Sequence, residues 1–196
     1  MPYDPLKHHR HSIRLKGYDY SQAGAYFLTL LVKNRECLLG EIINGQFQPN
    51  DFGRVIETFW DELPRRYPEI ELDAFVVMPN HVHGIIVIVG PLSVRAIHEL
   101  PLQLSQEPPL PEPSLRAIRR QMLLPKVVGY FKMNTAKRLN QMRGIEGAPF
   151  WHRNYYEHII RNEADLNRIR EYIQNNPTRW ADDQLHPEAP PNQFNR

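Results

Sequence analysis

Hydrophobic and polar positions follow two different periods along the chain, and together they predict a mixture of strands and helices. Residues 25–32 (AYFLTLLV) are mostly aromatic or aliphatic and predict a buried strand, followed by a shorter one at 37–42 (CLLGEI). Residues 72–78 (LDAFVVM) and 81–89 (HVHGIIVIV) predict two more strands around the turn-forming dipeptide Pro-Asn. We expect this last pair to be antiparallel, because the connection between its strands is so short.

Three segments change to a helical period: 51–67, 126–143 and 162–176. Asp51 lies near the start of the first helix, Asn162 is placed to cap the last one, and Pro177 ends it. Residues 148–161 predict a further short strand and turn. The apolar faces of the first two helices are formed by Val55, Ile56, Phe59, Trp60 and Leu63, and by Val128, Phe131, Thr135, Leu139 and Met142.

This order of elements predicts an α+β fold, ferredoxin-like or RRM-like, in which helices pack on one face of an antiparallel sheet. Residues 91–125 contain seven prolines, and we interpret them as an extended, mobile insertion that interrupts one domain without dividing it. We expect the domain to span residues 1–184 and a loose tail to follow at 185–196.

Composition adds less than the pattern does. The length of 196 residues suits one domain, and a net charge of +2 does not by itself predict a nucleic-acid partner. The single cysteine, Cys37, excludes an internal disulfide and suits a reducing compartment. The N-terminus lacks an apolar signal core, and no apolar run is long enough to cross a bilayer, so we expect a soluble intracellular protein.

Two histidines interrupt the most apolar segment of the chain. Alternate residues of a strand share a face, so His81 and His83 lie side by side while Val82 points the other way. This geometry suits two ligands of one metal ion, and it equally suits two strand histidines satisfied by hydrogen bonds. Either way, burying both imidazoles requires a polar partner.

The last predicted helix offers a candidate for that partner. Leu166, Ile169 and Ile173 form its apolar stripe, while Tyr172 and Asn176 lie one turn apart along one margin of that stripe. Docking the stripe on the sheet would hold both polar groups at the edge of the contact. Taken alone, the spacing Y-x-x-x-N is weak evidence for a site, because a tyrosine in this position is usually a packing residue.

Together, these segments resemble the single-tyrosine HUH transposases, and among them the REP-associated tyrosine transposases. The resemblance spans about residues 12–180, and its most specific parts are MPNHVHG followed at a distance by YIQNNP. It implies that Tyr172 is the nucleophile and that His81, His83 and Asn176 bind a divalent metal, Mg²⁺ or Mn²⁺. It also implies a prokaryotic, nucleoid-associated enzyme, monomeric or homodimeric, that cleaves and rejoins single-stranded or hairpin DNA through a 5′-phosphotyrosine link.

Several alternatives remain open at this point. Tyr155 and Tyr156 are rival nucleophiles, although neither has an amide one turn later. A second class of function is an RRM-like module that binds single-stranded nucleic acid without any reaction. A third is a zinc hydrolase that adds His152 or His158 to His81 and His83, but the sequence shows no accompanying carboxylate motif.

Basic residues suggest where DNA would be held. We expect phosphate contacts from Arg161, Arg168, Lys132 and Arg14, although a solvated surface explains such residues about equally well. Arg14 belongs to an N-terminal run, residues 5–17, that contains no acidic residue and could form a DNA-binding arm.

Overall fold

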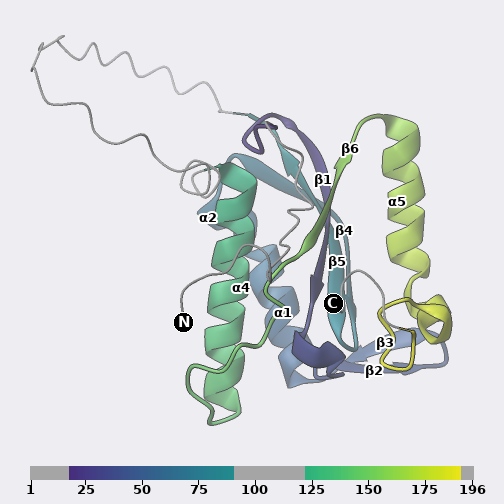
Figure 1. The fold of residues 1–196 in the computed structure, drawn as a ribbon. Coiled ribbons are helices and arrows are strands. Elements are labelled where there is room, and N and C mark those ends of the chain that lie inside the picture. The colour runs from purple at the N-terminus through teal and green to yellow at the C-terminus, as the bar shows by residue number, and fades with distance from the viewer. Residues whose placement is uncertain (1–17, 91–121, 191–196) are drawn as a thin grey trace, which may run out of the picture.

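The computed structural model describes residues 18–90 and 122–190, which form strands and helices (Figure 1). The strands are β1 (Gly24–Leu31), β2 (Gly40–Ile43), β3 (Gln46–Pro49), β4 (Ile70–Met78), β5 (His81–Ile88) and β6 (Tyr156–Ile160). The α-helices are α1 (Asp51–Asp61), α2 (Leu63–Arg66), α4 (Leu123–Met142) and α5 (Glu163–Asn175). Two short 3-10 helices complete the order, η1 (Lys33–Arg35) and η2 (Pro177–Asp182).

Four strands form the central sheet in the order β4-β5-β1-β6, and every neighbouring pair is antiparallel. With α1 between β1 and β4, and α4 between β5 and β6, this is the β-α-β-β-α-β order of a ferredoxin-like fold. The prediction of an α+β fold with an antiparallel sheet is therefore confirmed. The predicted pairing of the two strands around Pro-Asn is confirmed as well.

One face of the sheet carries the larger core. Every second residue of β1 (Tyr26, Leu28 and Leu30) points into it, and α1 and α4 cover that face (Figure 1). Trp60 of α1 and Phe131 of α4 meet edge to face at the centre of this layer, with ring centroids 5.6 Å apart. Burial of these helical stripes is what fixes both helices against the sheet.

The other face is covered by α5, and here the structure differs from the expectation that helices would pack on one face. Ile169 and Ile173 of α5 dock on Phe27, Ile85 and Ile160, whose side chains point away from the larger core. The physical reason lies in β1, which is apolar at almost every position and therefore needs cover on both faces. Figure 1 shows the sheet lying between α4 and α5.

A small hairpin, β2 and β3, stands apart from the central sheet. The short strand predicted at 37–42 corresponds to β2, while β3 was not predicted. Asn44 and Gly45 form the turn with positive φ angles of 52° and 74°, a backbone conformation that asparagine and glycine tolerate best. Gly45 approaches Thr178 of η2, so the hairpin supports the segment that follows α5.

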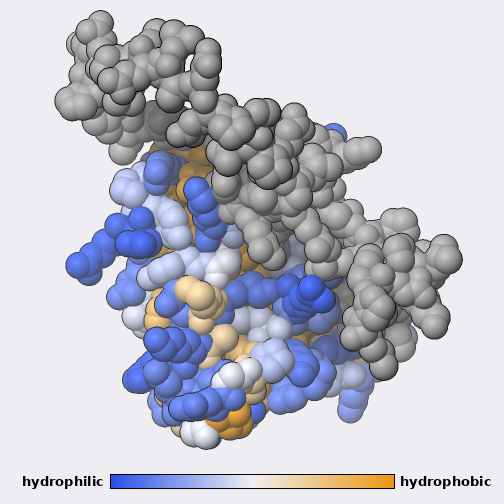
Figure 2. All heavy atoms as spheres, turned by 60° about the vertical axis from the view of Figure 1, so that its left-hand side comes forward, coloured by the Kyte–Doolittle hydropathy of each residue, from blue (hydrophilic) through white to orange (hydrophobic). Residues whose placement is uncertain are grey.

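Most of the insertion predicted at residues 91–125 lies outside the described residues, but its end at 123–125 is the first turn of α4. The side of the molecule shown in Figure 2 is mainly hydrophilic, with separate small hydrophobic patches over its described part. Within residues 18–90 and 122–190, none of the helices has the length and apolar character needed to span a bilayer.

Candidate active site

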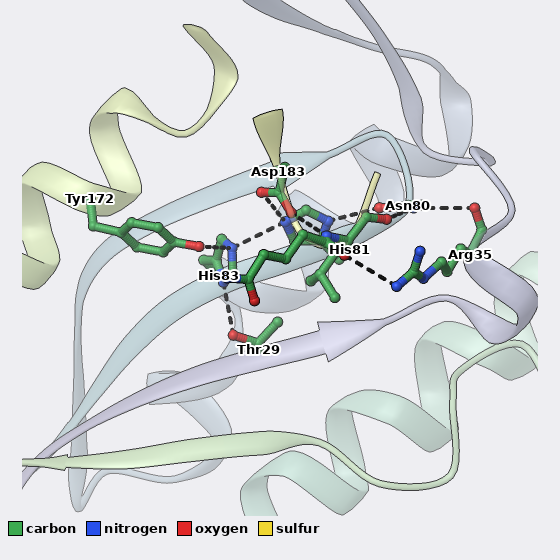
Figure 3. Close-up of polar contacts among 9 residues, drawn as sticks. Thr29, Arg35, Asn80, His81, His83, Tyr172 and Asp183 are labelled. Atoms are coloured by element: carbon green, nitrogen blue, oxygen red, sulfur yellow. Dashed lines mark hydrogen bonds and ion pairs between the residues drawn. The ribbon is translucent and has the colours of Figure 1, made fainter. Parts of the chain in front are cut away.

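His81 and His83 lie on the face of β5 that α5 covers, and both are buried, with 0% and 2% of their surfaces exposed. Their neighbours along that face are Ile85 and Val87, which pack in the α5 core. The Nε2 atoms of the two imidazoles are 3.1 Å apart, so both rings aim at one point (Figure 3). The same-face geometry inferred from the H-x-H spacing is thus present.

Asn80 fixes the orientation of the His81 ring. Its amide nitrogen donates to the backbone carbonyls of Leu185 and Arg35, at 2.8 and 3.2 Å, which turns its oxygen toward His81 Nδ1 at 2.8 Å. An amide oxygen only accepts, so His81 Nδ1 carries the proton. The unprotonated Nε2 of His81 therefore presents its lone pair to the site.

Thr29 and Tyr172 flank the second histidine (Figure 3). The Thr29 hydroxyl lies 2.9 Å from His83 Nδ1, across the β1–β5 pairing in which the two residues are direct partners. The Tyr172 hydroxyl lies 3.2 Å from His83 Nε2. Tyr172 reaches inward from α5 while 44% of its surface stays exposed, so the hydroxyl is at the histidines and the residue remains open to a large substrate.

Two oxygen-bearing side chains complete the polar cluster. Asn176 is 3% exposed, and its buried Oδ1 atom has no hydrogen-bond partner among the described residues. Asp183 brings a carboxylate oxygen to 3.9 Å from His81 Nε2. His81, His83 and Asp183 offer ligand atoms within 4.8 Å of one another.

This donor set fits a divalent metal. The Nε2 atoms of His81 and His83 are 3.1 Å apart, close enough for both to bind one ion. Asp183 or the partnerless amide oxygen of Asn176 could supply an oxygen ligand to such an ion.

Burial sets the charge state of the cluster. It lowers the pKa of His83 to about 3 and holds the pKa of His81 well below its ordinary range, with the neighbouring His83 adding to the effect on His81. Both imidazoles are therefore neutral near pH 7, the form that binds a metal. Burial, helped by the negative charge of Asp183, raises the pKa of Tyr172 to about 12. The phenol thus keeps its proton in the absence of a cation.

Local features of α5 place Tyr172. Asn162 caps the helix as predicted, with its side-chain oxygen accepting from the backbone N–H of Asp165 at 2.8 Å. Arg170, on the side facing β4, binds both carboxylate oxygens of Asp73. Asp73 lies in a β-bulge of β4 between Leu72 and Phe75. Apolar packing, the cap and this ion pair together fix the rotation of the helix.

The basic residues predicted to contact DNA are dispersed. Arg168 lines the pocket that contains His83 and Tyr172. Arg161 is exposed just past β6, about 17 Å along the strand from Tyr156 in the Thr29 row. Lys132 belongs to α4 on the opposite face, where its ammonium donates to the carbonyls of His152 and Arg153. Arg14 and the N-terminal run lie outside the described residues.

The rival residues occupy different places. Tyr156 lines the same pocket as Tyr172, whereas Tyr155 packs on the opposite face, where Lys132 lies 6.0 Å from its ring centre. His158 bonds to Asp165 through Nε2 at 2.8 Å. Within the described residues, neither His152 nor His158 belongs to the group that could hold a metal.

The structure adds residues that sequence reasoning missed. Asp183 reaches the histidines because the chain folds back toward them through η2 after α5. The periodicity of hydrophobic residues does not predict such a change of chain direction. Asn80 had been interpreted only as a turn residue, although its position directly before the H-x-H motif was a usable signal. Thr29 had no signal of its own, since its role depends on the pairing of β1 with β5.

Comparison with known proteins places the chain among relatives. It is 44% identical over 179 residues to an uncharacterized protein of Haemophilus influenzae, covering 91% of this chain and 94% of that protein. It is 23% identical over 181 residues to another protein of that organism, provisionally named a REP-associated tyrosine transposase, with 91% and 84% of the two chains covered. This relative confirms the resemblance inferred from the motifs. No protein-family model matches the chain.

Two solved structures are similar at lower levels. One is a REP-associated tyrosine transposase bound to a REP hairpin, with 19% identity, a TM-score of 0.48, and 87% and 74% of the two chains covered. The other is a Deinococcus radiodurans protein provisionally named a transposase, with 18% identity, a TM-score of 0.44, and 84% and 97% covered. By its sequence, the chain belongs to the family of the uncharacterized Haemophilus influenzae protein and resembles the REP-associated tyrosine transposases.

Proposed function

We propose that the protein is a metal-dependent endonuclease and strand transferase of single-stranded DNA, with Tyr172 as its nucleophile. The observation that carries this proposal is the Tyr172 hydroxyl 3.2 Å from His83 Nε2, which is in turn 3.1 Å from His81 Nε2. A phenol held beside two neutral, buried imidazoles is an arrangement suited to attack on a phosphodiester. From the resemblance to REP-associated transposases, we also expect the cleaved strand to lie beside a hairpin.

His81, His83 and an oxygen of Asn176 or Asp183 would hold the ion, Mg²⁺ or Mn²⁺. When bound, it would neutralise phosphate charge and lower the pKa of the phenol. Asn80 and Thr29 keep the two imidazoles turned toward that point. Docking of α5 keeps the Tyr172 hydroxyl there as well, so little reorganisation precedes attack.

The reaction balances without any further reactant. The Tyr172 oxygen forms a bond to phosphorus, the bond from phosphorus to the 3′-oxygen breaks, and the phenolic proton ends on the released 3′-hydroxyl. The product is a 5′-phosphotyrosine, whose energy is close to that of the bond it replaces. Attack by another 3′-hydroxyl then rejoins DNA and restores the phenol, so no nucleotide triphosphate is consumed.

Changing Tyr172 to Phe tests the nucleophile. The substitution removes only the hydroxyl, so the ring still packs against Phe27 and folding is retained. We expect the covalent protein–DNA adduct on a denaturing gel to disappear, with single strands labelled at the 3′ end, the end that the adduct retains, as substrate. Tyr155→Phe and Tyr156→Phe are the matched controls and keep adduct formation.

An adduct that persists in Tyr172→Phe and is lost in a control would place the nucleophile elsewhere. Strand binding without any adduct in the wild type would favour a non-catalytic binding module.

Metal binding is tested separately from cleavage. The double change His81→Ala and His83→Ala should abolish Mn²⁺ binding measured by calorimetry, and Asn176→Ala should weaken it, because each removes a donor atom from the cluster. Asp183→Asn keeps the shape of its side chain and removes its charge, so its effect reports whether this carboxylate is also a ligand. His158→Ala leaves the donor cluster intact and is the control. Unchanged Mn²⁺ affinity in the double variant would refute the metal site.

A further inference from the structure

The pocket that contains His83 continues beyond it toward the edge strand β6. It has a volume of about 910 Å³ and runs between α5 and the strands beneath it. Across the sheet, His83, Thr29 and Tyr156 form one row, and Phe27 and His158 belong to the next. Rows of side chains on the same face are about 6.6 Å apart, so Phe27 and His158 lie about that far along the sheet from the row of His83.

Aromatic rings form the floor of this outer part. Phe27 stacks on His83 with ring centres 5.3 Å apart, and it meets Tyr156 edge to face at 6.2 Å. Tyr172 closes the cluster at 6.0 Å from Phe27. Phe27 is almost fully buried, whereas Tyr156 is only half-buried at the edge strand β6. The aromatic surface therefore begins at the reacting hydroxyl and continues to the rim through Tyr156.

Polar side chains from the sheet and from α5 line the same pocket beside these rings. Asp165 accepts from His158 Nε2 at 2.8 Å and pairs with Arg168, which fixes both side chains at the rim. Asn175 also lines the pocket. Acidic residues line it too, namely Glu171, Asp182 and Asp183 beside Arg168 and Arg179. Because the lining of the whole pocket carries charges of both signs, charge alone does not make it selective for an anion.

We propose that this outer pocket, formed by Phe27, Tyr156, His158 and Arg168, binds one unpaired nucleobase of the DNA strand. Resting on the proposed function, it takes the base next to the phosphate that Tyr172 attacks. A base is uncharged, flat and aromatic, and it carries hydrogen-bonding groups at its edge. Those properties match an aromatic floor with polar walls of mixed charge. Tyr156, which the sequence had offered as a rival nucleophile, is then a positioning residue that holds the base.

Equilibrium binding tests this subsite without depending on cleavage. In a Tyr172→Phe background, the affinity is measured by fluorescence anisotropy for a labelled single-stranded oligonucleotide and for an abasic oligomer of the same length and charge. The ratio of the two affinities isolates the contribution of the bases. Tyr156→Ala should lower this ratio by about 5- to 150-fold, the range expected for one stacked base. Tyr156→Leu, which fills space without a ring, should lower it similarly and guards against a packing defect.

Two matched variants should leave the ratio unchanged. Tyr156→Phe keeps the ring, and Tyr130→Ala removes a half-buried tyrosine from α4 on the opposite face. An unchanged ratio in folded Tyr156→Ala or Tyr156→Leu would overturn the subsite, as would an equal loss in Tyr130→Ala. Failure of the proposed function shows differently, as the absence of a Tyr172-dependent adduct in the wild type. Base-dependent binding through Tyr156 would stand even then.

Discussion

The two histidines of the cluster are oriented by different partners, His81 by the side-chain amide of Asn80 and His83 by the hydroxyl of Thr29. Asn80 lies in the β4–β5 turn and ties His81 to the backbone at Leu185 and Arg35. Arg35 in turn donates to the carbonyls of Gln184, His186 and Ala189. Residues 185–189, which we expected to begin a loose tail, are therefore held against the domain next to the site. His83 is oriented instead from within the sheet by Thr29.

Changing Thr29 to Val tests that orientation. Valine keeps the shape but leaves the buried Nδ1 of His83 without its partner, which should lower the free energy of unfolding by about 1–3 kcal/mol. Because the hydroxyl also fixes the ring, Mn²⁺ affinity should fall by about 10- to 100-fold. Urea unfolding and calorimetry measure the two effects. Thr58→Val, in an exposed part of α1, should leave metal affinity unchanged. Wild-type Mn²⁺ affinity in Thr29→Val would show that His83 needs no such partner.

At the level of elements, the periodicity of hydrophobic residues predicted most of the strands and helices. It did not predict which face of the sheet each helix covers. The stripe of Leu166, Ile169 and Ile173 predicted that α5 docks, but a stripe does not say which face of a sheet receives it. The answer depended on β1, whose apolar run needs cover on both sides. The β2–β3 hairpin was missed although Asn44-Gly45 is a strong turn signal, because its strands are short and only partly buried.

The residues of the candidate site also fall into two groups, those that local patterns predicted and those that they did not. The H-x-H spacing was visible in a single strand, and the positions of Tyr172 and Asn176 were visible on a single helix. Asp183 and Thr29 were not, because each joins the cluster through a chain return or a strand pairing that local patterns do not encode. Sequence patterns thus identified side chains placed by one element, and they missed those placed by contacts between elements.

The ion pair of Arg170 with Asp73 makes the docking of α5 dependent on pH. The guanidinium lowers the pKa of Asp73 below its ordinary value of 3.8. A lowered folded pKa contributes stability above that value, and the contribution is lost as pH falls through the folded pKa. Asp73→Asn should therefore lower the free energy of unfolding at pH 7 by about 1 kcal/mol or less, since the pair is partly exposed.

Urea unfolding at neutral and strongly acidic pH measures this difference, which should shrink at the acidic end. Glu71→Gln, an exposed neighbour on β4, should have little effect at either pH and is the control. A deficit in Asp73→Asn that stays constant with pH would mean that the carboxylate charge does not hold α5.

At the scale of the whole molecule, the two faces of the sheet are coupled through β5. His83 faces the site, while the next residue, Gly84, faces the larger core beneath Trp60. Trp60 stacks on Phe75 with ring centres 4.4 Å apart and lies over Gly84. A Cβ atom at position 84 would come within 2.4 Å of the Trp60 ring and 3.0 Å of Phe75. The absence of a side chain there lets α1 approach the strand that carries the histidines.

Changing Gly84 to Ala should therefore disturb both faces at once. Overpacking against Trp60 should lower the free energy of unfolding by about 1–3 kcal/mol, and displacement of β5 should weaken Mn²⁺ binding at His83 on the opposite side. The cost of Gly84→Ala should be smaller in a Trp60→Phe background, where the clashing ring is gone. Gly129→Ala is the matched control, because this helical glycine of α4 has open space around it and alanine should raise stability by about 0.5–1 kcal/mol. If Gly84→Ala cost the same in both backgrounds, contact with Trp60 would not be what confines β5.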